Sequence, residues 1–413
     1  MRKIFIGLIL LLVGAWLALW LGSAVMRRVL VSSSDRTWPI GLGPLMNVPA
    51  RYPPLQMTSG AAQLIALSRP LGIDLAPRSR SEGMGGTGGP MSFVRSQLDS
   101  WVIAEVQRPS ARIETMPSES GEYLAGHAGD LAAARTLLLS EEPIVWPQDV
   151  ADPASPLPAL LGHLQLGRVF IASALDRARV GDAGGWDDLR AAWKLSLILA
   201  LRPDVGSNIA ALANARRVNG AARKMPLPPP AWLAEVQAFD FRRAFLGAYQ
   251  AGAWSIADRV AAETSVDGNE ATRKVVDAVM APYTRMSAVD MADAWREAAW
   301  EIARETKCDF DRAALEAEQQ DDVAWWNFPA REISTPNLTG MWQNVFRFNA
   351  ECEATVRALR LRAGQPAMAE STCADGRWVY AADGRSFAFS RNMPEPSVAG
   401  TAIPLRFALD ARE

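Results

Sequence analysis

Apolar residues recur every three to four positions through the middle of the chain, the spacing that predicts amphipathic helices. Three such runs follow one another closely, at 156–180, 186–202 and 205–225. The first stops at Gly181-Asp182, the second before Pro203 and the third before Pro226. Short connections place successive helices side by side in opposite directions, so we expect antiparallel helical hairpins.

Helical patterns resume after the proline-rich break at 226–230. They cover 232–263, 269–280, 288–319 and 340–363. The last run is the clearest, because its apolar side is spaced 3, 4, 3, 4 and 3 and predicts a packing seam. The seam consists of Trp342, Val345, Asn349, Cys352, Val356 and Leu359.

The pattern changes to alternation near the C-terminus. Residues 378–380 and 386–390 flank Asp383-Gly384, which predicts two strands around a tight turn, and 403–409 can add a third strand. An isolated hairpin is only marginally stable, so we expect it to rest on the helices. The fold class that follows is mainly α, an array of antiparallel helical hairpins with a small C-terminal antiparallel sheet.

An uncharged stretch from Ile4 to Met26 lies between Arg2-Lys3 and Arg27-Arg28. As a helix it would span about 34 Å, enough to cross a hydrocarbon core of about 30 Å. We therefore expect an N-terminal transmembrane helix whose partner is the lipid bilayer. The alternative is a signal peptide cleaved near Gly22-Ser23-Ala24, but cleavable apolar regions are usually shorter.

The positive charges on the two sides of this stretch are nearly balanced, so they give little indication of orientation. The short flank before a long apolar run favours a signal anchor with its N-terminus in the cytoplasm. The expected location is the bacterial inner membrane, in a single pass, with the remaining chain in the periplasm.

Composition shifts divide the chain into five predicted parts. These are an anchor at 1–31, a Pro-rich stalk at 32–57, helical subdomains at 58–225 and 226–364, and a small β-containing segment at 365–413. The Pro-rich part is either a stalk or a packed irregular segment, because its prolines preclude a continuous helix. Glycines between Arg78 and Pro90 predict a flexible loop, since no Lys-Ser/Thr follows them as a phosphate loop requires.

Charge and composition argue against two classes of ligand. The 413 residues carry 43 basic and 45 acidic side chains, a formal net charge of −2, which offers no field for nucleic acid. Two histidines and three cysteines leave little for a zinc site, and we expect no metal or other cofactor. His127 lies near Glu119 and Asp130, and His163 lies in an apolar helix; structural roles are expected for both.

Cys352 and Cys373 are 21 positions apart and bracket the end of the last long helix and the entry to the hairpin. In an oxidising compartment a disulfide between them would tie these two elements together. The alternative is two unlinked thiols, with Cys352 serving as a small apolar residue in the seam. In either case Cys308 is left over.

Trp325-Trp326 follows the acidic pair Asp321-Asp322 in a predicted loop. Most of the fifteen tryptophans fall in apolar stripes and are expected in the core. Trp325 and Trp326 are therefore the predicted contact with a protein partner in the envelope.

Three short motifs resemble an uncharacterised bacterial family of single-span, mainly helical membrane proteins. They are 52–54 through 71–77, Trp146-Pro147-Gln148-Asp149 with Pro156-Leu157-Pro158, and Pro230-Ala231-Trp232-Leu233 before Asp240. The resemblance covers about residues 50–260 and implies only a general layout, without an activity or catalytic residue.

These observations predict a membrane-anchored helical protein with a structural or protein-interaction role in the envelope. One alternative is an anchored enzyme, such as a hydrolase, although no H-E-x-x-H, G-x-S-x-G or Walker-type motif occurs in the sequence. A second alternative is a tetratricopeptide-like adaptor, because 170–199 resembles one copy of such a hairpin.

Overall fold

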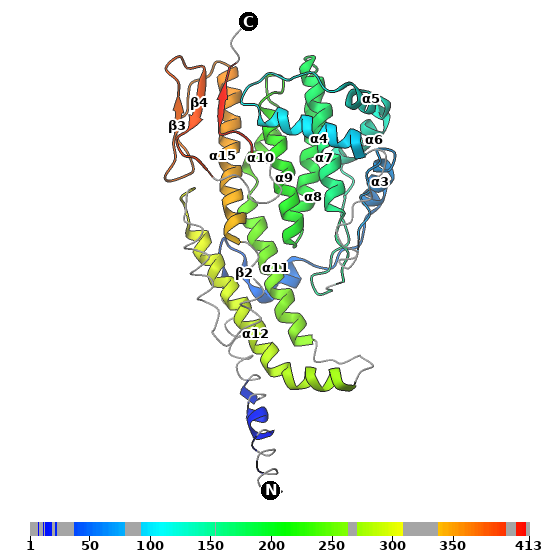
Figure 1. The fold of residues 1–413 in the computed structure, drawn as a ribbon, viewed down its shortest axis with the longest axis vertical. Helices are drawn as coiled ribbons and strands as arrows, with labels where there is room; N and C mark the ends of the chain where they lie inside the picture. Colours follow the sequence, from blue (N-terminus) through cyan, green and yellow to red (C-terminus); the bar gives the residue numbers. More distant parts are fainter. Residues whose placement is uncertain are drawn as a thin grey trace.

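The computed structural model describes most of the chain, and it is mainly helical with a small C-terminal sheet (Figure 1). This confirms the predicted fold class at that level. The described residues are 37–78, 92–152, 154–262, 271–308, 338–393 and 402–409, together with Gly7, Leu11, 13–18 and 21–22.

The elements follow the chain in this order. The first half contains β1 (Thr37–Trp38), β2 (Gly43–Pro44), η1 (Leu45–Asn47), α2 (Val48–Arg51), α3 (Ser59–Ser68), α4 (Ser92–Gln107), α5 (Ser118–Gly126), α6 (Ala128–Leu139), α7 (Leu160–Arg179), α8 (Gly185–Ala200) and α9 (Val205–Ala222). The second half contains α10 (Leu233–Ala238), α11 (Phe241–Ala262), α12 (Ala271–Arg304), α15 (Leu338–Arg362), β3 (Trp378–Tyr380), β4 (Ser386–Phe389) and β5 (Arg406–Ala408).

Helices α7, α8 and α9 pack against one another and form the centre of the first half. Gly181, with φ +79°, makes the turn after α7, and the Asp204 side chain accepts a hydrogen bond from the Ser207 amide at the start of α9. The Asn214 side chain joins α9 to α8, because its Nδ2 donates to the Ala192 carbonyl at 2.8 Å. The three predicted helices are thus confirmed, and they form a three-helix unit.

The described residues form two hydrophobic cores, and α15 contributes to both. Val345, Phe348 and Cys352 belong to the core formed with α9 and the helices before it. Trp342 and Phe346 belong to the second core, which includes residues of α11 and α12. The predicted seam is therefore only part of the apolar surface of this helix, which is buried on nearly all sides.

The Pro-rich segment is packed over at least part of its length. Trp38, Leu42, Leu45 and Val48 are buried in the second core, against residues of α11. Residues 37–48 therefore do not form a free stalk. Burial of these apolar side chains accounts for the packing, since prolines exclude a helix but do not prevent apolar contacts.

Helix α12 differs from its prediction in two ways. The two expected runs, 269–280 and 288–319, are joined into one helix that includes Pro282, and this helix ends at Arg304. Its end is defined locally, because the Glu305 carboxylate accepts hydrogen bonds from the amides of Thr306 and Lys307 at 2.8 Å. Side chain to backbone bonds of this kind compete with helix continuation.

The C-terminal strands form the antiparallel sheet β3-β4-β5, in agreement with the predicted hairpin and third strand. Gly384 adopts φ +65° in the turn between β3 and β4, a conformation that favours glycine. Phe387 and Phe407 face each other across β4 and β5 and are buried in the second core. The sheet lies beside α15 (Figure 1).

The predicted anchor at 4–26 lies mostly outside the described residues and stays a prediction. Within the described ranges, no helix has both the length and the apolar character needed to cross a bilayer. The described residues of the segment are helical, and Leu11 and Leu21 expose 70% and 59% of their surface.

Candidate functional site

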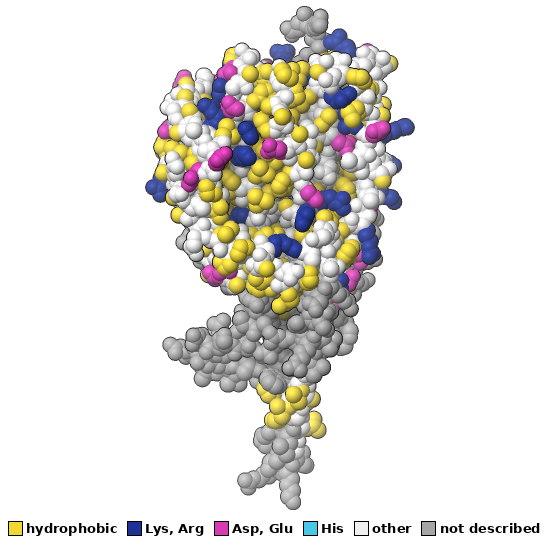
Figure 2. Space-filling view, turned by 180° about the vertical axis from the view of Figure 1, so that it is seen from behind, with side chains coloured by type: hydrophobic (Ala, Val, Ile, Leu, Met, Phe, Trp, Pro, Cys, Tyr) yellow, Lys and Arg dark blue, Asp and Glu magenta, His cyan; other side chains and the backbone are white. Residues whose placement is uncertain are grey.

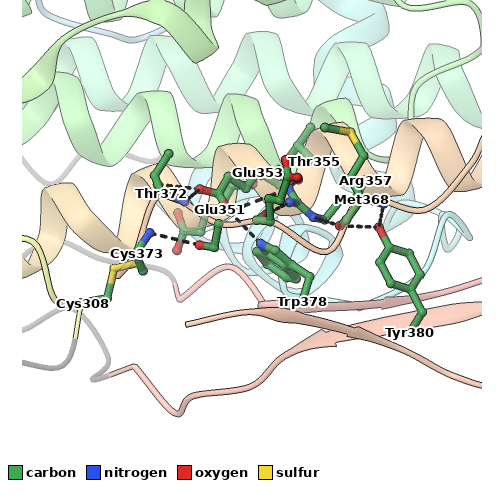
Figure 3. Close-up of polar contacts among 12 residues, drawn as sticks. Cys308, Glu351, Glu353, Thr355, Arg357, Met368, Thr372, Cys373, Trp378 and Tyr380 are labelled. Atoms are coloured by element: carbon green, nitrogen blue, oxygen red, sulfur yellow. Dashed lines mark hydrogen bonds and ion pairs between the residues drawn. A yellow bond between two sulfur atoms is a disulfide. The ribbon is translucent and has the colours of Figure 1, made fainter. Parts of the chain in front are cut away.

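The segment that follows α15 is bound to that helix by the Glu353 carboxylate (Figure 3). Its Oε1 accepts hydrogen bonds from the amide and the hydroxyl of Thr372, at 2.8 and 2.5 Å. Its Oε2 accepts the indole N–H of Trp378 at 2.6 Å. Both oxygens are occupied, so this carboxylate positions the segment and is a poor candidate for a general base.

Arg357, one helical turn after Glu353, completes the attachment. Its guanidinium donates to the Met368 carbonyl at 2.9 Å and also to the Glu370 carbonyl, and it lies 4.8 Å from the Trp378 ring centroid. Burial lowers the pKa of this guanidinium, and Glu353 opposes that effect. The spacing of Glu353 and Arg357, four positions apart on one helix face, is the sequence signal for this pair.

A disulfide joins Cys308 to Cys373 next to this attachment. The two Cα atoms lie 5.5 Å apart, and the Cys308 amide donates to the Asp375 carboxylate at 2.9 Å. The bond links the end of α12 to the chain between α15 and β3. The predicted bond between Cys352 and Cys373 is therefore wrong, and the cysteine expected to be left over is a partner in the disulfide.

Cys352 is a buried free thiol on the other side of α15. Asn219 of α9 donates to its sulfur at 3.5 Å. Burial and the nearby Glu351 charge raise the pKa of this thiol well above its ordinary value. The alternative interpretation from the sequence, a small apolar residue in the seam, describes its environment correctly.

Buried charges connect α9 to α15. Arg216 donates to both oxygens of Glu351, at 2.9 and 2.5 Å, and Arg347 donates to the same carboxylate at 3.2 Å. Arg223 donates to the Thr355 hydroxyl and to the Glu351 carbonyl, both at 3.0 Å. Burial lowers the pKa of Arg223 to about 10, although Glu351 opposes this. The periodicity of apolar residues gave no signal for these buried ion pairs.

The two histidines lie in different surroundings and are not brought together. His163 is buried against the Trp146 ring, and its Nδ1 bonds the Ala159 carbonyl at 2.9 Å. Burial lowers its pKa to about 4, so the ring is neutral at pH 7. His127 lies at the junction of α5 and α6, with its Nδ1 3.3 Å from the Asp130 carboxylate. The expected structural role fits the surroundings of His163.

A groove of about 260 Å³ lies between α10 and α15. Its lining is mostly apolar and includes Leu233 and Leu359, and its polar members are Gln237, Arg360 and Gln365. Neither histidine contributes to it. On the face of the molecule behind that of Figure 1, apolar side chains gather in a central band with charged side chains on both sides (Figure 2).

Trp325 and Trp326, the predicted partner contact, lie outside the described residues. Among the residues that are described, no group of three or more His, Cys, Asp or Glu side chains is arranged to hold a metal ion. Comparison with family models, curated proteins and solved structures found no match to this chain. The family resemblance noted from short motifs stays a prediction.

Proposed function

We propose that this chain is a bacterial inner-membrane protein whose helical body lies in the periplasm, where it has a structural or protein-interaction role. The observation that carries the location is the Cys308–Cys373 disulfide. Structural disulfides persist in oxidising compartments and are rare in the bacterial cytoplasm. Both cysteines are buried, which is typical of a structural bond.

The apolar segment at 4–26 supplies the membrane part of the proposal. Its length is sufficient for one span. Its described residues are helical and expose large apolar side chains, including Val13 and Leu17. Exposed leucines and valines on a helix outside the folded body are unfavourable in water and favourable in lipid.

The location is tested with two reporters fused after Glu413 in bacterial cells. We expect alkaline phosphatase to be active there and green fluorescent protein to be dark, and we expect the chain to stay in membranes after an alkaline carbonate wash. A reporter that works only in the cytoplasm would contradict the orientation. A chain trimmed near Ala24 and recovered in the aqueous extract would contradict the anchor.

The interaction role is tested by crosslinking the full-length protein in membranes and identifying the recovered partners. The double variant Trp325→Ala, Trp326→Ala is the comparison, because this pair is the contact proposed from the sequence. We expect the variant to lose crosslinked partners while it remains in the membrane. An unchanged set of partners would exclude the tryptophan pair as the contact.

A further inference from the structure

The native disulfide joins cysteines that are not consecutive in the sequence. The chain order is Cys308, Cys352, Cys373, and the bond joins the first to the third over a separation of 65 residues. Cys352 stays a free thiol, 6% exposed. Correct pairing therefore requires that Cys308 bond to Cys373 and not to Cys352, which lies between them in the sequence.

The unfolded chain favours the two wrong pairs. The probability of closing a flexible loop falls roughly as the 3/2 power of its length. Compared with the native pair Cys308–Cys373, the pair Cys352–Cys373 therefore forms about five times as readily. The pair Cys308–Cys352 forms about twice as readily. An exported chain also delivers Cys308 and then Cys352 before Cys373 emerges. A bond between Cys308 and Cys352 is thus the first one available.

The folded molecule excludes both wrong pairs. Cys352 belongs to the core shared with α9, whereas Cys308 and Cys373 belong to the second core. Glu351 and Thr355, on either side of Cys352, accept hydrogen bonds from Arg216 of α9 and from Arg223, the residue that follows α9. Turning Cys352 toward either partner would break these hydrogen bonds to α15. A wrongly bonded chain therefore cannot close its two cores around that helix.

We propose that the chain is a substrate of a thiol–disulfide isomerase in the envelope, which removes bonds to Cys352 and allows Cys308 to pair with Cys373. The inference rests on the proposed function, because it requires that the body fold in an oxidising compartment.

The chemistry needs one oxidation and two successive thiol–disulfide exchanges. A disulfide-donating oxidase accepts two electrons and two protons from Cys308 and Cys352 as the first bond forms. The isomerase thiolate then attacks Sγ of Cys308, which breaks that bond and releases Cys352 as a thiolate that takes up a proton. Cys373, after losing its proton, attacks the same sulfur and expels the isomerase thiolate. The two exchanges together involve no net electron transfer.

Folding makes the native pair resistant to further exchange. Cys308 and Cys373 are 0% and 3% exposed, so an attacking thiolate has little access to their bond. Burial raises the pKa of Cys352 and keeps it protonated, and only the thiolate attacks a disulfide.

The test follows the full chain in bacterial cells with and without their envelope disulfide isomerase. Free thiols are alkylated at the moment of lysis, and bonded peptides are identified by mass spectrometry. For the wild type we expect a severalfold lower fraction of the native bond without the isomerase, with Cys352 found in the wrong bonds. The variant Cys352→Ala should form the native bond equally in both strains, and Cys352→Ser provides a second control.

An equal native fraction and an equal rate of formation for the wild type in both strains would overturn the inference alone. A native bond that forms poorly without the isomerase even in both Cys352 variants would also overturn it, because no wrong bond to Cys352 would then be the cause. Three reduced cysteines in normal cells would overturn both the inference and the proposed location.

Discussion

Glu351 is the buried carboxylate that Arg216 and Arg347 share between α9 and α15. Replacing it by glutamine leaves two buried guanidiniums without a compensating charge. We expect Glu351→Gln to lower the free energy of unfolding by about 3–5 kcal/mol. Thermal and denaturant unfolding of the full chain in detergent measure this change.

The matched comparison is Arg179→Ala, which removes a half-exposed pair with Asp176. Surface pairs of this kind contribute about 0–1 kcal/mol. Similar losses of unfolding free energy in the two variants would contradict this prediction. They would show that the buried ion pairs of Glu351 contribute no more than a surface pair.

The buried ring of His163 should make the free energy of unfolding depend on pH in a defined way. Its pKa is about 4 in the folded chain and 6.5 in the reference state, so the unfolded chain binds more protons between these values. Stability contributed by the neutral ring is present above pH 6.5 and is lost as the pH falls toward 4. The full loss is about 3 kcal/mol.

The variant His163→Gln isolates this contribution from that of the carboxylates. Urea unfolding of both proteins at pH 7, 6 and 5 should show a steeper loss for the wild type. Parallel pH profiles would contradict a buried neutral histidine.

At the level of residues, the sequence restricted the cysteine chemistry but could not assign the pairing. Three cysteines allow three single bonds, and loop length favours the pair Cys352–Cys373. The pairing depends on which face of α15 carries Cys352 and which face Cys308 and Cys373 lie against. Long-range packing between α9, α12 and the C-terminal segment determines both. The Glu353–Trp378 contact depends on the same packing.

At the level of elements, close approach of α7 to α9 depends on Gly167. A Cβ added there would overlap the side-chain amide of Asn214, which bonds Ala192 and Ser196 of α8. We expect Gly167→Ala to destabilise the chain by about 1–3 kcal/mol, since overpacking forces helices apart. The change is measured by the shift in the unfolding midpoint.

Gly121→Ala in α5 provides the control. Apart from its chain neighbours and the backbone of its own helix, no atom lies within 4 Å of the position of its added Cβ, and helical glycine costs roughly 0.5–1 kcal/mol relative to alanine. This variant should be neutral or stabilised. Equal destabilisation of both variants would exclude the contact with Asn214 as the cause.

Elements that end at strong local signals were predictable. Glycine and proline punctuation placed α7, α8 and α9 correctly, and Asp383-Gly384 placed the turn of the hairpin. The continuity of α12 across Pro282 was missed. The choice between a stalk and a packed segment was left open, because the packing of 37–48 depends on burial against distant helices. Proline alone indicates what the backbone cannot form, and it does not indicate what the side chains contact.

At the level of the whole molecule, the disulfide joins two residues of the second core that are far apart in the sequence. Loop-entropy arithmetic for a separation of 65 residues gives about 4 kcal/mol of stabilisation. We expect Cys308→Ser to lose about this amount, and Cys352→Ala to lose only about 1 kcal/mol from one buried sulfur. Unfolding under non-reducing conditions compares them.

A second measurement uses a reductant. It should lower the melting temperature of the wild type and of Cys352→Ala by the same amount, and leave Cys308→Ser unchanged. A reductant effect on Cys308→Ser would show that another bond contributes to stability.

Because α15 has one face in each core, neither core can be completed without residues 338–362. The body should therefore melt as one calorimetric unit, with a van't Hoff enthalpy close to the measured heat. Fragments that stop before Leu338 would leave two open apolar surfaces, and proteases should degrade them during export.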